Sequence, residues 1–354
     1  MIINQWVPAA HRGDAIGDSA RRVRDILRRK GYVSDIYALT IDDDLLDEVS
    51  SFNLPQARRG DVTILHFAIP SPMGQALAEL PGGRVLHYHN ITPARFFMPY
   101  APTITRMARL GRQELEELSG RVDLALGVSE YNRKELEELG FKSTAVMPLA
   151  LDVDRFTTTA TNLTLERVLD DGLTNILFVG RIAPNKKIED HIRLAEHYKR
   201  YVDNYYRFIF VGRYDGIPRY YATIRALMSE YKLPPERFVF TGPVSDEELI
   251  TYYRMSNAYV SLSEHEGFCV PLVEAMASNV PVLAYAAGAV PETLGGAGLL
   301  FQPKDLEFAA ELLGMLVYDD EVHEAVVANQ RRRLTAFGND QTEQQLDWLV
   351  SRFS

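Results

Sequence analysis

Two glutamates separated by seven residues, Glu266 and Glu274, have a spacing that suggests chemistry. They frame the stretch EGFCVPLVE, which follows an apolar run typical of a strand and leads into a run typical of a helix. Pro271 suits the start of that helix, because the N–H that proline lacks would be unpaired there anyway. Free N–H groups at a helix start can bind an anion, and a carboxylate can accept hydrogen bonds from both hydroxyls of a vicinal diol.

This arrangement favours a diphosphate at the helix start, with one acid holding a ribose and the other a sugar. A charged hydrogen bond of that kind contributes about 1.5–3 kcal/mol. Each acid alone has an equally good structural explanation. Glu274 could be an acid favoured by the helix dipole, and Glu266 a solvated acid of the loop.

Glycine ends three apolar runs in the second half of the chain. The runs NILFVGRI, YRFIFVGRY and RFVFTGPV carry Gly180, Gly212 and Gly242. In an open parallel sheet, ligands bind at the carboxyl ends of the strands, where glycine lets the backbone come close. The three glycines therefore predict a shared binding surface for a ligand that carries phosphate.

The elements that must position these residues alternate between strands and helices. In the first half we expect strands over 2–7, 34–39, 62–67, 84–89, 124–129 and 144–148, and helices over 17–30, 104–118 and 131–139. The second half repeats the plan, and such alternation builds a mostly parallel sheet with helices on both faces. The polar, threonine-rich segment 149–164 is predicted to be an interdomain linker. Two doubly wound domains in one chain imply a cleft between them.

Composition excludes several classes of protein. The 354 residues carry a net charge of −10, with nearly all of the excess acid after residue 150, which argues against nucleic acid as the main partner. No apolar run is long enough to span a membrane, and the first residues lack the pattern of a signal peptide. The single cysteine, Cys269, excludes an intrachain disulfide framework. The cytoplasm is the predicted location.

The segment 20–30, ARRVRDILRRK, is strongly basic. Val23, Ile26 and Leu27 mark the buried face of a helix and leave its cations outside. A solvated basic face is one interpretation. Docking on lipid headgroups at the inner face of a membrane is the other.

Two further patterns invite a metal. His87 and His89 share one face of a predicted strand, but no third ligand is apparent nearby, so we expect no metal there. The three acids Asp42–Asp44 lie far from the other motifs, and they are expected to start a helix or to face solvent.

The chain resembles a known family on several ordered motifs. The segment SEHEGFCVPLVEAMASNVPVLAYAAGAVPETLGGAGLLF (263–301) is similar to the donor-binding signature of retaining GT-B glycosyltransferases of family 4, with Glu266 and Glu274 as its Glu–seven residues–Glu motif. VGRIAPNKKIED (179–190) resembles the Gly-Arg…Lys segment of that family, and HYHNITP (87–93) resembles the segment that holds a histidine of the catalytic site.

The resemblance implies an α/β protein with the GT-B fold, in which two Rossmann-like doubly wound domains face a central cleft. Residues 1–160 would form the acceptor-binding domain, completed by a C-terminal helix over 336–354. Residues 161–335 would form the domain that binds the nucleotide-sugar donor.

The resemblance also implies roles for individual residues. Arg181 and Lys186 would hold the donor diphosphate, and two cations there stabilise the charge of the leaving nucleotide without a metal. Glu274 would hold the ribose, Glu266 the transferred sugar, and His89 would lie beside that sugar. The implied catalytic residues are His89, Arg181, Lys186 and Glu266. The implied donor-binding residues are Gly17, Gly180, Arg181, Lys186, Gly212, Gly242, Val244, Glu266, Gly267, Phe268, Cys269, Val270 and Glu274. Cys269 departs from the family, which usually has a second glycine at its position.

The activity implied is the retaining transfer of a hexose, mannose or glucose, from a nucleotide-diphosphate sugar. The acceptor would be a glycan, a lipid-linked glycan or a small molecule, and the reaction would follow a front-face mechanism without cofactor or metal. The alternatives are a non-catalytic subunit that binds nucleotide-sugar, and a phosphorylase or epimerase with the same fold. The sequence does not indicate an oligomeric state.

Overall fold

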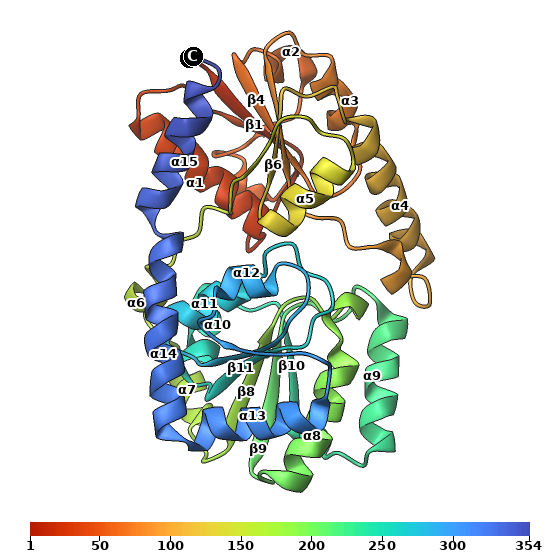
Figure 1. Cartoon of the computed structure of the whole chain (residues 1–354), viewed down its shortest axis with the longest axis vertical. Helices are drawn as coiled ribbons and strands as arrows, with labels where there is room; N and C mark the ends of the chain where they lie inside the picture. The colour runs from red at the N-terminus through yellow and green to blue at the C-terminus, as the bar shows by residue number, and fades with distance from the viewer. The chain divides into compact units, whose positions relative to one another are not determined.

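The computed structural model describes all 354 residues, and the chain divides into two compact units (Figure 1). The first unit comprises Met1–Arg95, Pro102–Leu151 and Phe337–Ser354. The second comprises Phe96–Ala101 and Asp152–Ala336. The division therefore falls after Leu151, whereas the sequence prediction places it after residue 160. The short segment Phe96–Ala101 is assigned to the second unit, which the sequence did not indicate.

The first unit is built on a seven-stranded sheet in the order β3-β2-β1-β4-β5-β6-β7, and all of its neighbouring strands run parallel. The strands are β1 (Ile3–Ala10), β2 (Ile36–Ile41), β3 (Ser50–Ser51), β4 (Val62–Phe67), β5 (Gly83–Tyr88), β6 (Leu124–Gly127) and β7 (Thr144–Val146). Six of them confirm the predicted strands, and β3 was not predicted. The strand order reverses between β1 and β4, which is where open α/β sheets bind ligands.

Helices cover both faces of this sheet. They are α1 (Ala15–Arg29), α2 (Leu54–Ala57), α3 (Pro72–Ala78), α4 (Pro102–Glu117), α5 (Glu130–Glu138) and α15 (Asn339–Ser351), with short 3-10 turns η1 (Asp43–Leu45) and η2 (Ala94–Phe96). The three predicted helices are confirmed as α1, α4 and α5. The predicted inner face of α1 is buried against the sheet, where Leu346 and Leu349 of α15 join the same apolar cluster. The C-terminal helix thus completes the core of the first unit (Figure 1).

The second unit holds a six-stranded parallel sheet in the order β10-β9-β8-β11-β12-β13. The strands are β8 (Thr174–Val179), β9 (Tyr206–Val211), β10 (Phe238–Gly242), β11 (Ala258–Ser261), β12 (Val282–Tyr285) and β13 (Leu299–Phe301). The helices are α6 (Arg155–Thr158), α7 (Leu163–Leu169), α8 (Ile188–Tyr201), α9 (Pro218–Glu230), α10 (Asp246–Arg254), α11 (Val270–Ala277), α12 (Val290–Leu294), α13 (Leu306–Tyr318) and α14 (Asp320–Leu334), with 3-10 turns η3 (Pro184–Lys186), η4 (Pro235–Arg237) and η5 (Thr335–Phe337). The strand order reverses between β8 and β11.

The predicted linker 149–164 is not an unstructured connection. It contains α6 and the start of α7. Phe156 of α6 is buried, and its ring packs edge-on against Tyr253 at 5.7 Å. No clear hydrophobic period is visible in this stretch, because a four-residue helix is too short to display one.

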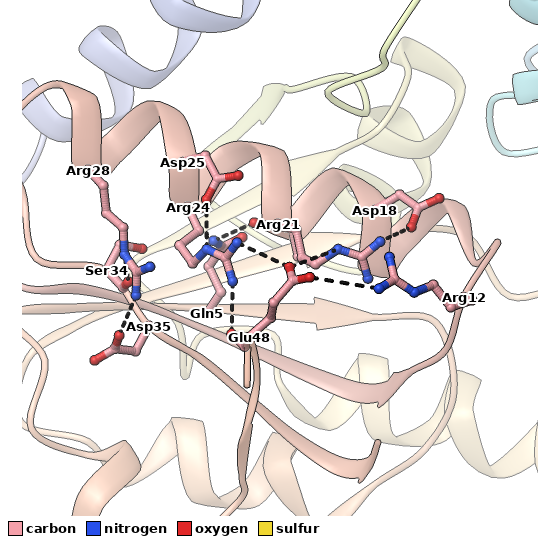
Figure 2. Close-up of polar contacts among 11 residues, drawn as sticks. Gln5, Arg12, Asp18, Arg21, Arg24, Asp25, Arg28, Ser34, Asp35 and Glu48 are labelled. Carbon is pink, nitrogen blue, oxygen red and sulfur yellow. Dashed lines mark hydrogen bonds and ion pairs between the residues drawn. The ribbon is translucent and has the colours of Figure 1, made fainter. Parts of the chain in front are cut away.

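The basic segment 20–30 lies almost wholly in α1, and most of its cations form ion pairs within the first unit; Figure 2 shows Arg21, Arg24 and Arg28 with their partners. Glu48 accepts a hydrogen bond from Arg24 at 3.4 Å and lies 3.7 Å from Arg21. The remaining ion pairs join Arg21 to Asp18, Arg24 to Asp25, Arg28 to Asp35, Arg29 to Glu343, and Lys30 to Asp347. Local acids therefore balance most of this positive charge. This pairing favours the solvated basic face, and docking on lipid headgroups stays a prediction.

Helix length and composition also bear on membranes. No helix of the structure is both long enough and apolar enough to cross a bilayer.

Candidate functional site

The predicted donor residues of the second unit gather at the carboxyl edge of its sheet. Lys186 belongs to η3, in the connection that leaves β8, and Glu266 lies in the connection that leaves β11. These two strands are neighbours at the point where the strand order reverses. The topology thus brings together two residues that are far apart in the sequence, at the position where such sheets bind ligands.

Lys186 and Glu266 form an ion pair. The Nζ atom of Lys186 lies 2.5 Å from Oε1 and 2.7 Å from Oε2 of Glu266, so the ammonium contacts both carboxylate oxygens. Glu266 is buried, at 7% exposure. A buried carboxylate requires such a partner. The next residue in the chain is also a lysine. Lys187 points elsewhere and pairs with Glu189 at 2.9 Å.

The backbone of Glu266 is held by a loop that the sequence did not single out. The amide of Ala289 donates to the Glu266 carbonyl at 3.0 Å. A Cβ atom on Gly288 would approach that carbonyl oxygen to 2.6 Å, and Gly288 also has a left-handed φ of +57°. Only glycine therefore fits beside Glu266 at this position. The segment AAGAVPE that carries it lay inside the family signature, but its function as a support for Glu266 was not foreseen.

Glu274 lies inside α11 and is held by two side chains that sequence reasoning missed. Nη2 of Arg155 donates to Oε1 at 3.0 Å, and the hydroxyl of Tyr253 donates to Oε2 at 2.9 Å. Burial raises the pKa of Glu274, although Arg155 and Tyr253 both act to lower it. A carboxylate has about four acceptor positions, and these two bonds leave room for ribose hydroxyls.

The start of α11 differs from the prediction by one residue. The helix begins at Val270, so Pro271 occupies its second position. Cys269 precedes the helix with φ of +70°, a left-handed conformation that costs a residue other than glycine about 1–3 kcal/mol. This conformation gives a physical reason for glycine at this position in the family that the chain resembles. Burial, together with the nearby Glu266 carboxylate, raises the pKa of the Cys269 thiol well above its usual value, so it is no activated nucleophile.

The neighbours of Cys269 line the same helix start. Phe268 is buried, and its carbonyl accepts a hydrogen bond from the Thr293 hydroxyl at 2.5 Å. Gly267 and Val270 are partly exposed. Their backbone groups lie where the prediction placed the phosphates, at the first turn of α11.

The three predicted glycines do lie at three adjacent strand ends. Gly180 follows β8, Gly212 follows β9, and Gly242 ends β10. Each has a positive φ, and a Cβ atom on Gly212 would come within 2.4 Å of the Gly180 carbonyl oxygen. The amide of Gly212 also donates to Gly242 at 3.1 Å. Close backbone packing therefore explains Gly212 by itself, independently of any ligand.

Arg181 and Val244 complete the predicted donor residues of this unit. Arg181 is exposed, directly after Gly180, and its guanidinium makes no hydrogen bond or ion pair. Val244 is partly exposed in the turn before α10. Both lie in connections that leave the carboxyl edge of the sheet, from β8 and β10 respectively.

In the first unit, Gly17 lies in the first turn of α1. Its amide donates to the Asp14 carboxylate at 3.1 Å, which is an N-cap contact. A Cβ atom at Gly17 would meet only ordinary contacts of 3.7 Å and more. The protein packing therefore does not itself require glycine there.

Three histidines meet at the carboxyl ends of β4 and β5. His66 pairs in register with His87, and His89 follows on the same face. One nitrogen atom from each of the three rings lies within 4.8 Å of the other two. The sequence-based statement that no third ligand lies near His87 and His89 is wrong, because β4 supplies His66. Burial lowers the pKa of His87 to about 4 and those of His66 and His89 well below their usual value, so the rings are neutral.

Comparison with known proteins identifies relatives of both the sequence and the fold. The family described as Glycosyl transferases group 1 matches residues 166–333. A GDP-mannose-dependent alpha-mannosyltransferase of Mycobacterium tuberculosis is 31% identical over 246 residues, which cover 68% of this chain and 60% of that protein. The serotype-specific mannosyltransferase WbdA of Escherichia coli is 28% identical over 159 residues, which cover 44% of this chain and 19% of WbdA. The chain thus matches 60% or less of the length of these relatives.

Solved structures extend the likeness to the entire chain. HepE of Anabaena, determined in complex with UDP and glucose, aligns with a TM-score of 0.80 and 17% identity over 99% of this chain and all of that one. WaaG, a glycosyltransferase involved in lipopolysaccharide biosynthesis, aligns with a TM-score of 0.74 and 12% identity over 97% and 98% of the two chains. At these identities the likeness concerns the fold alone, and that fold is GT-B.

Proposed function

Because the chain belongs to the glycosyl transferases group 1 family through residues 166–333 and has the GT-B fold, we propose that it is a hexosyltransferase that uses a nucleotide-diphosphate sugar. The observation that carries the proposal is the pairing of Lys186 with Glu266 at the switch point of the second sheet. A lysine and a buried acid at one site suit the two parts of a nucleotide-sugar. The lysine provides a cation for the diphosphate, and the acid provides an acceptor for the sugar hydroxyls.

In this proposal the donor lies along the carboxyl edge of β8 and β11. The diphosphate takes the start of α11, where Lys186 turns from Glu266 towards phosphate and the exposed Arg181 closes on the same charge. Glu266, released from Lys186, accepts hydrogen bonds from the transferred sugar. Glu274, fixed by Arg155 and Tyr253, accepts them from the ribose.

Mannose is the favoured sugar and glucose the second. The support for mannose is the likeness to GDP-mannose-dependent and serotype-specific mannosyltransferases. The support for glucose is weaker, because HepE was solved with UDP and glucose but shares the fold alone. The proposed acceptor is a hydroxyl group of a glycan, a lipid-linked glycan or a small glycoside.

We further propose that the transfer retains the anomeric configuration and requires no metal. The cations Arg181 and Lys186 supply the charge stabilisation that a divalent ion would otherwise give the leaving diphosphate. The acceptor hydroxyl attacks on the face from which the nucleoside diphosphate leaves, and the leaving phosphate helps to take its proton.

The deciding experiment measures binding of GDP, UDP and ADP to the full chain by calorimetry, followed by transfer from the matching mannose and glucose donors. Selective binding of one nucleotide and transfer with retained configuration, followed by NMR of the anomeric proton, are expected. Transfer with inverted configuration would refute the mechanism. If none of the three nucleotides binds, the proposal that the donor is a nucleotide-diphosphate sugar is refuted.

A further inference from the structure

A chain of hydrogen bonds in the first unit leads from a backbone carbonyl to His89. Nε2 of Gln5 donates to the Ala20 carbonyl at 2.9 Å. Oε1 of Gln5 lies 2.9 Å from Nε2 of His66, and Nδ1 of His66 lies 2.9 Å from Nε2 of His89. This series of hydrogen bonds runs from β1 through β4 to the end of β5, so three neighbouring strands contribute to it.

The first bond of this chain fixes the direction of all the others. A backbone carbonyl can only accept, so the NH2 group of Gln5 must face Ala20 and its oxygen must face His66. That oxygen also only accepts, so His66 carries its proton on Nε2. Because burial keeps the His66 ring neutral, its Nδ1 has a lone pair and accepts from His89. His89 therefore holds its own proton on Nε2.

The other nitrogen of His89 is left without a partner. Nδ1 of His89 is shielded from solvent and makes no hydrogen bond. In the tautomer just assigned, this atom carries a lone pair, which is an acceptor. Buried acceptors without a donor are rare in proteins, and each calls for an explanation such as a ligand or a water.

The surroundings hold the ring of His89 in place. It stacks on His66, with 5.1 Å between centroids and 17° between planes, and its backbone amide donates to Phe67 at 2.9 Å. The segment that follows is tied to the helices behind it. The hydroxyl of Tyr88 accepts from the Ile91 amide at 3.0 Å and donates to Glu135 at 2.9 Å. The unpaired nitrogen thus has a defined position.

We propose that Gln5 and His66 are positioning residues that hold His89 with its proton on Nε2, so that Nδ1 accepts a hydrogen bond from a hydroxyl group of a ligand bound by the first unit. The identity of that hydroxyl rests on the proposed function. The tautomer itself rests only on the contacts of the first unit.

The same three histidines invite a competing interpretation as a metal centre. Nε2 of His87 donates to the Met147 carbonyl at 2.8 Å and that of His66 to Gln5, which is a pattern common among metal-binding histidines. However, a metal held by His66 would need the lone pair of its Nδ1, because its Nε2 faces the oxygen of Gln5. In the structure His66 Nδ1 lies 2.9 Å from His89 Nε2, and in the tautomer assigned above its lone pair accepts the proton of that atom.

The test is NMR of the full chain labelled with 15N-histidine, which reports which ring nitrogen carries the proton. We expect His89 to be protonated on Nε2 in the wild type, with its signals assigned through a His89→Phe variant. In His66→Phe the acceptor is lost and the His89 tautomers should mix. In His66→Asn, the amide oxygen takes the place of Nδ1 and should restore the single tautomer. His197→Phe is the matched control, since His197 is a partly exposed histidine of the second unit.

Activity gives the second measurement. His66→Phe and Gln5→Leu should each lower kcat by about tenfold, the rate equivalent of one hydrogen bond, and His66→Asn should recover most of it. Binding of nucleoside diphosphate should be unchanged in all three variants. A single His89 tautomer in His66→Phe would overturn the proposal.

Two other outcomes are also decisive. If one equivalent of Zn2+ shifts the signals of all three histidines and EDTA reverses the shift, the cluster is a metal centre and the proposal is wrong. If no donor supports transfer by the wild type, the proposed function fails, and the NMR still decides whether Gln5 and His66 set the tautomer. Should His66→Phe fail to fold, the wild-type spectrum and His66→Asn decide the question.

Discussion

Lys186 contacts both carboxylate oxygens of Glu266, at 2.5 and 2.7 Å. The two residues proposed to hold the diphosphate and the sugar therefore neutralise each other. A buried charge that loses its partner is strongly destabilising, whereas a buried pair replaced as a whole is often tolerated. The pair thus stabilises this edge of the sheet, and a donor diphosphate must compete with Glu266 for Lys186.

A double-mutant cycle on this pair tests that conclusion. Lys186→Met alone leaves the Glu266 carboxylate unpaired, and we expect it to lower the free energy of unfolding by about 2–4 kcal/mol. Lys186→Met combined with Glu266→Gln should restore at least half of that loss. Urea denaturation of the four proteins gives the coupling. Additive effects of the two substitutions would show that the pair contributes nothing to the stability of the free protein.

Glu274 is predicted to distinguish ribonucleotides from deoxynucleotides. The wild type should bind the cognate ribonucleoside diphosphate more tightly than its 2′- or 3′-deoxy analogue by about 1.5–3 kcal/mol, because a charged hydrogen bond is lost with the hydroxyl. In Glu274→Gln the discrimination should shrink, and calorimetry of each pair measures it. Lys187→Met is the control, since that lysine pairs with Glu189. Full discrimination in Glu274→Gln would remove the ribose role.

Arg181 can be tested separately, because its side chain is exposed and makes no hydrogen bond or ion pair. Its removal should leave stability unchanged, as is usual for exposed positions. Arg181→Ala should nevertheless slow transfer more than it weakens donor binding, since the charge it opposes grows as the nucleotide leaves. Steady-state kinetics with the donor identified by calorimetry separates kcat from KM. An unaltered kcat in Arg181→Ala would refute the proposed role of Arg181 at the diphosphate.

Metal independence is tested by removing divalent ions. Dialysis against EDTA should leave the transfer rate unchanged, because two side-chain cations are proposed to act on the diphosphate. Added Mg2+ or Mn2+ should not increase the transfer rate, because dialysis against EDTA is expected to leave that rate unchanged. Activity that disappears with EDTA and returns with Mn2+ would contradict the proposal.

The sequence predicted the two sheets well because their signal is local. Runs such as VTILHF and NILFVGRI are apolar along their length, which is typical of strands buried on both faces of a parallel sheet. The elements that were not predicted share a different cause. β3 has two residues and α6 has four, and elements this short carry no period that a sequence can display.

Only the site residues that lie in recognisable motifs were predicted. Glu266, Lys186 and Glu274 lie in recognisable segments, and the structure brings the first two into contact. Arg155, which holds Glu274, is separated from it by more than a hundred residues and lies in a stretch that was expected to be a linker. His66 meets His89 only because β4 and β5 are neighbours in register. Such contacts follow from topology, which residue spacing alone does not supply.

Glu114 of α4 is predicted to make stability depend on pH. Burial raises the pKa of Glu114 to about 7. The Ser71 amide donates a hydrogen bond to Oε2 at 3.0 Å, which acts to lower this pKa. The other carboxylate oxygen, Oε1, has no hydrogen-bond partner. The folded protein therefore holds a proton that the unfolded chain releases near pH 4.5, so the free energy of unfolding falls as pH rises from about 4.5 to 7 and levels above that range. A shift of this size corresponds to about 3 kcal/mol, and solvent screening of a half-buried group reduces it to about 1 kcal/mol.

Glu114→Gln isolates this effect, because the amide oxygen still accepts from Ser71 and no proton is released. The variant and the wild type should be about equally stable at pH 4.5, and the variant should be more stable by about 1 kcal/mol at pH 8. Denaturant unfolding at the two pH values measures the difference. Glu116→Gln, at an exposed position of the same helix, serves as the control and should show little change. A difference between Glu114→Gln and the wild type that stays constant with pH would mean that Glu114 does not carry the proton.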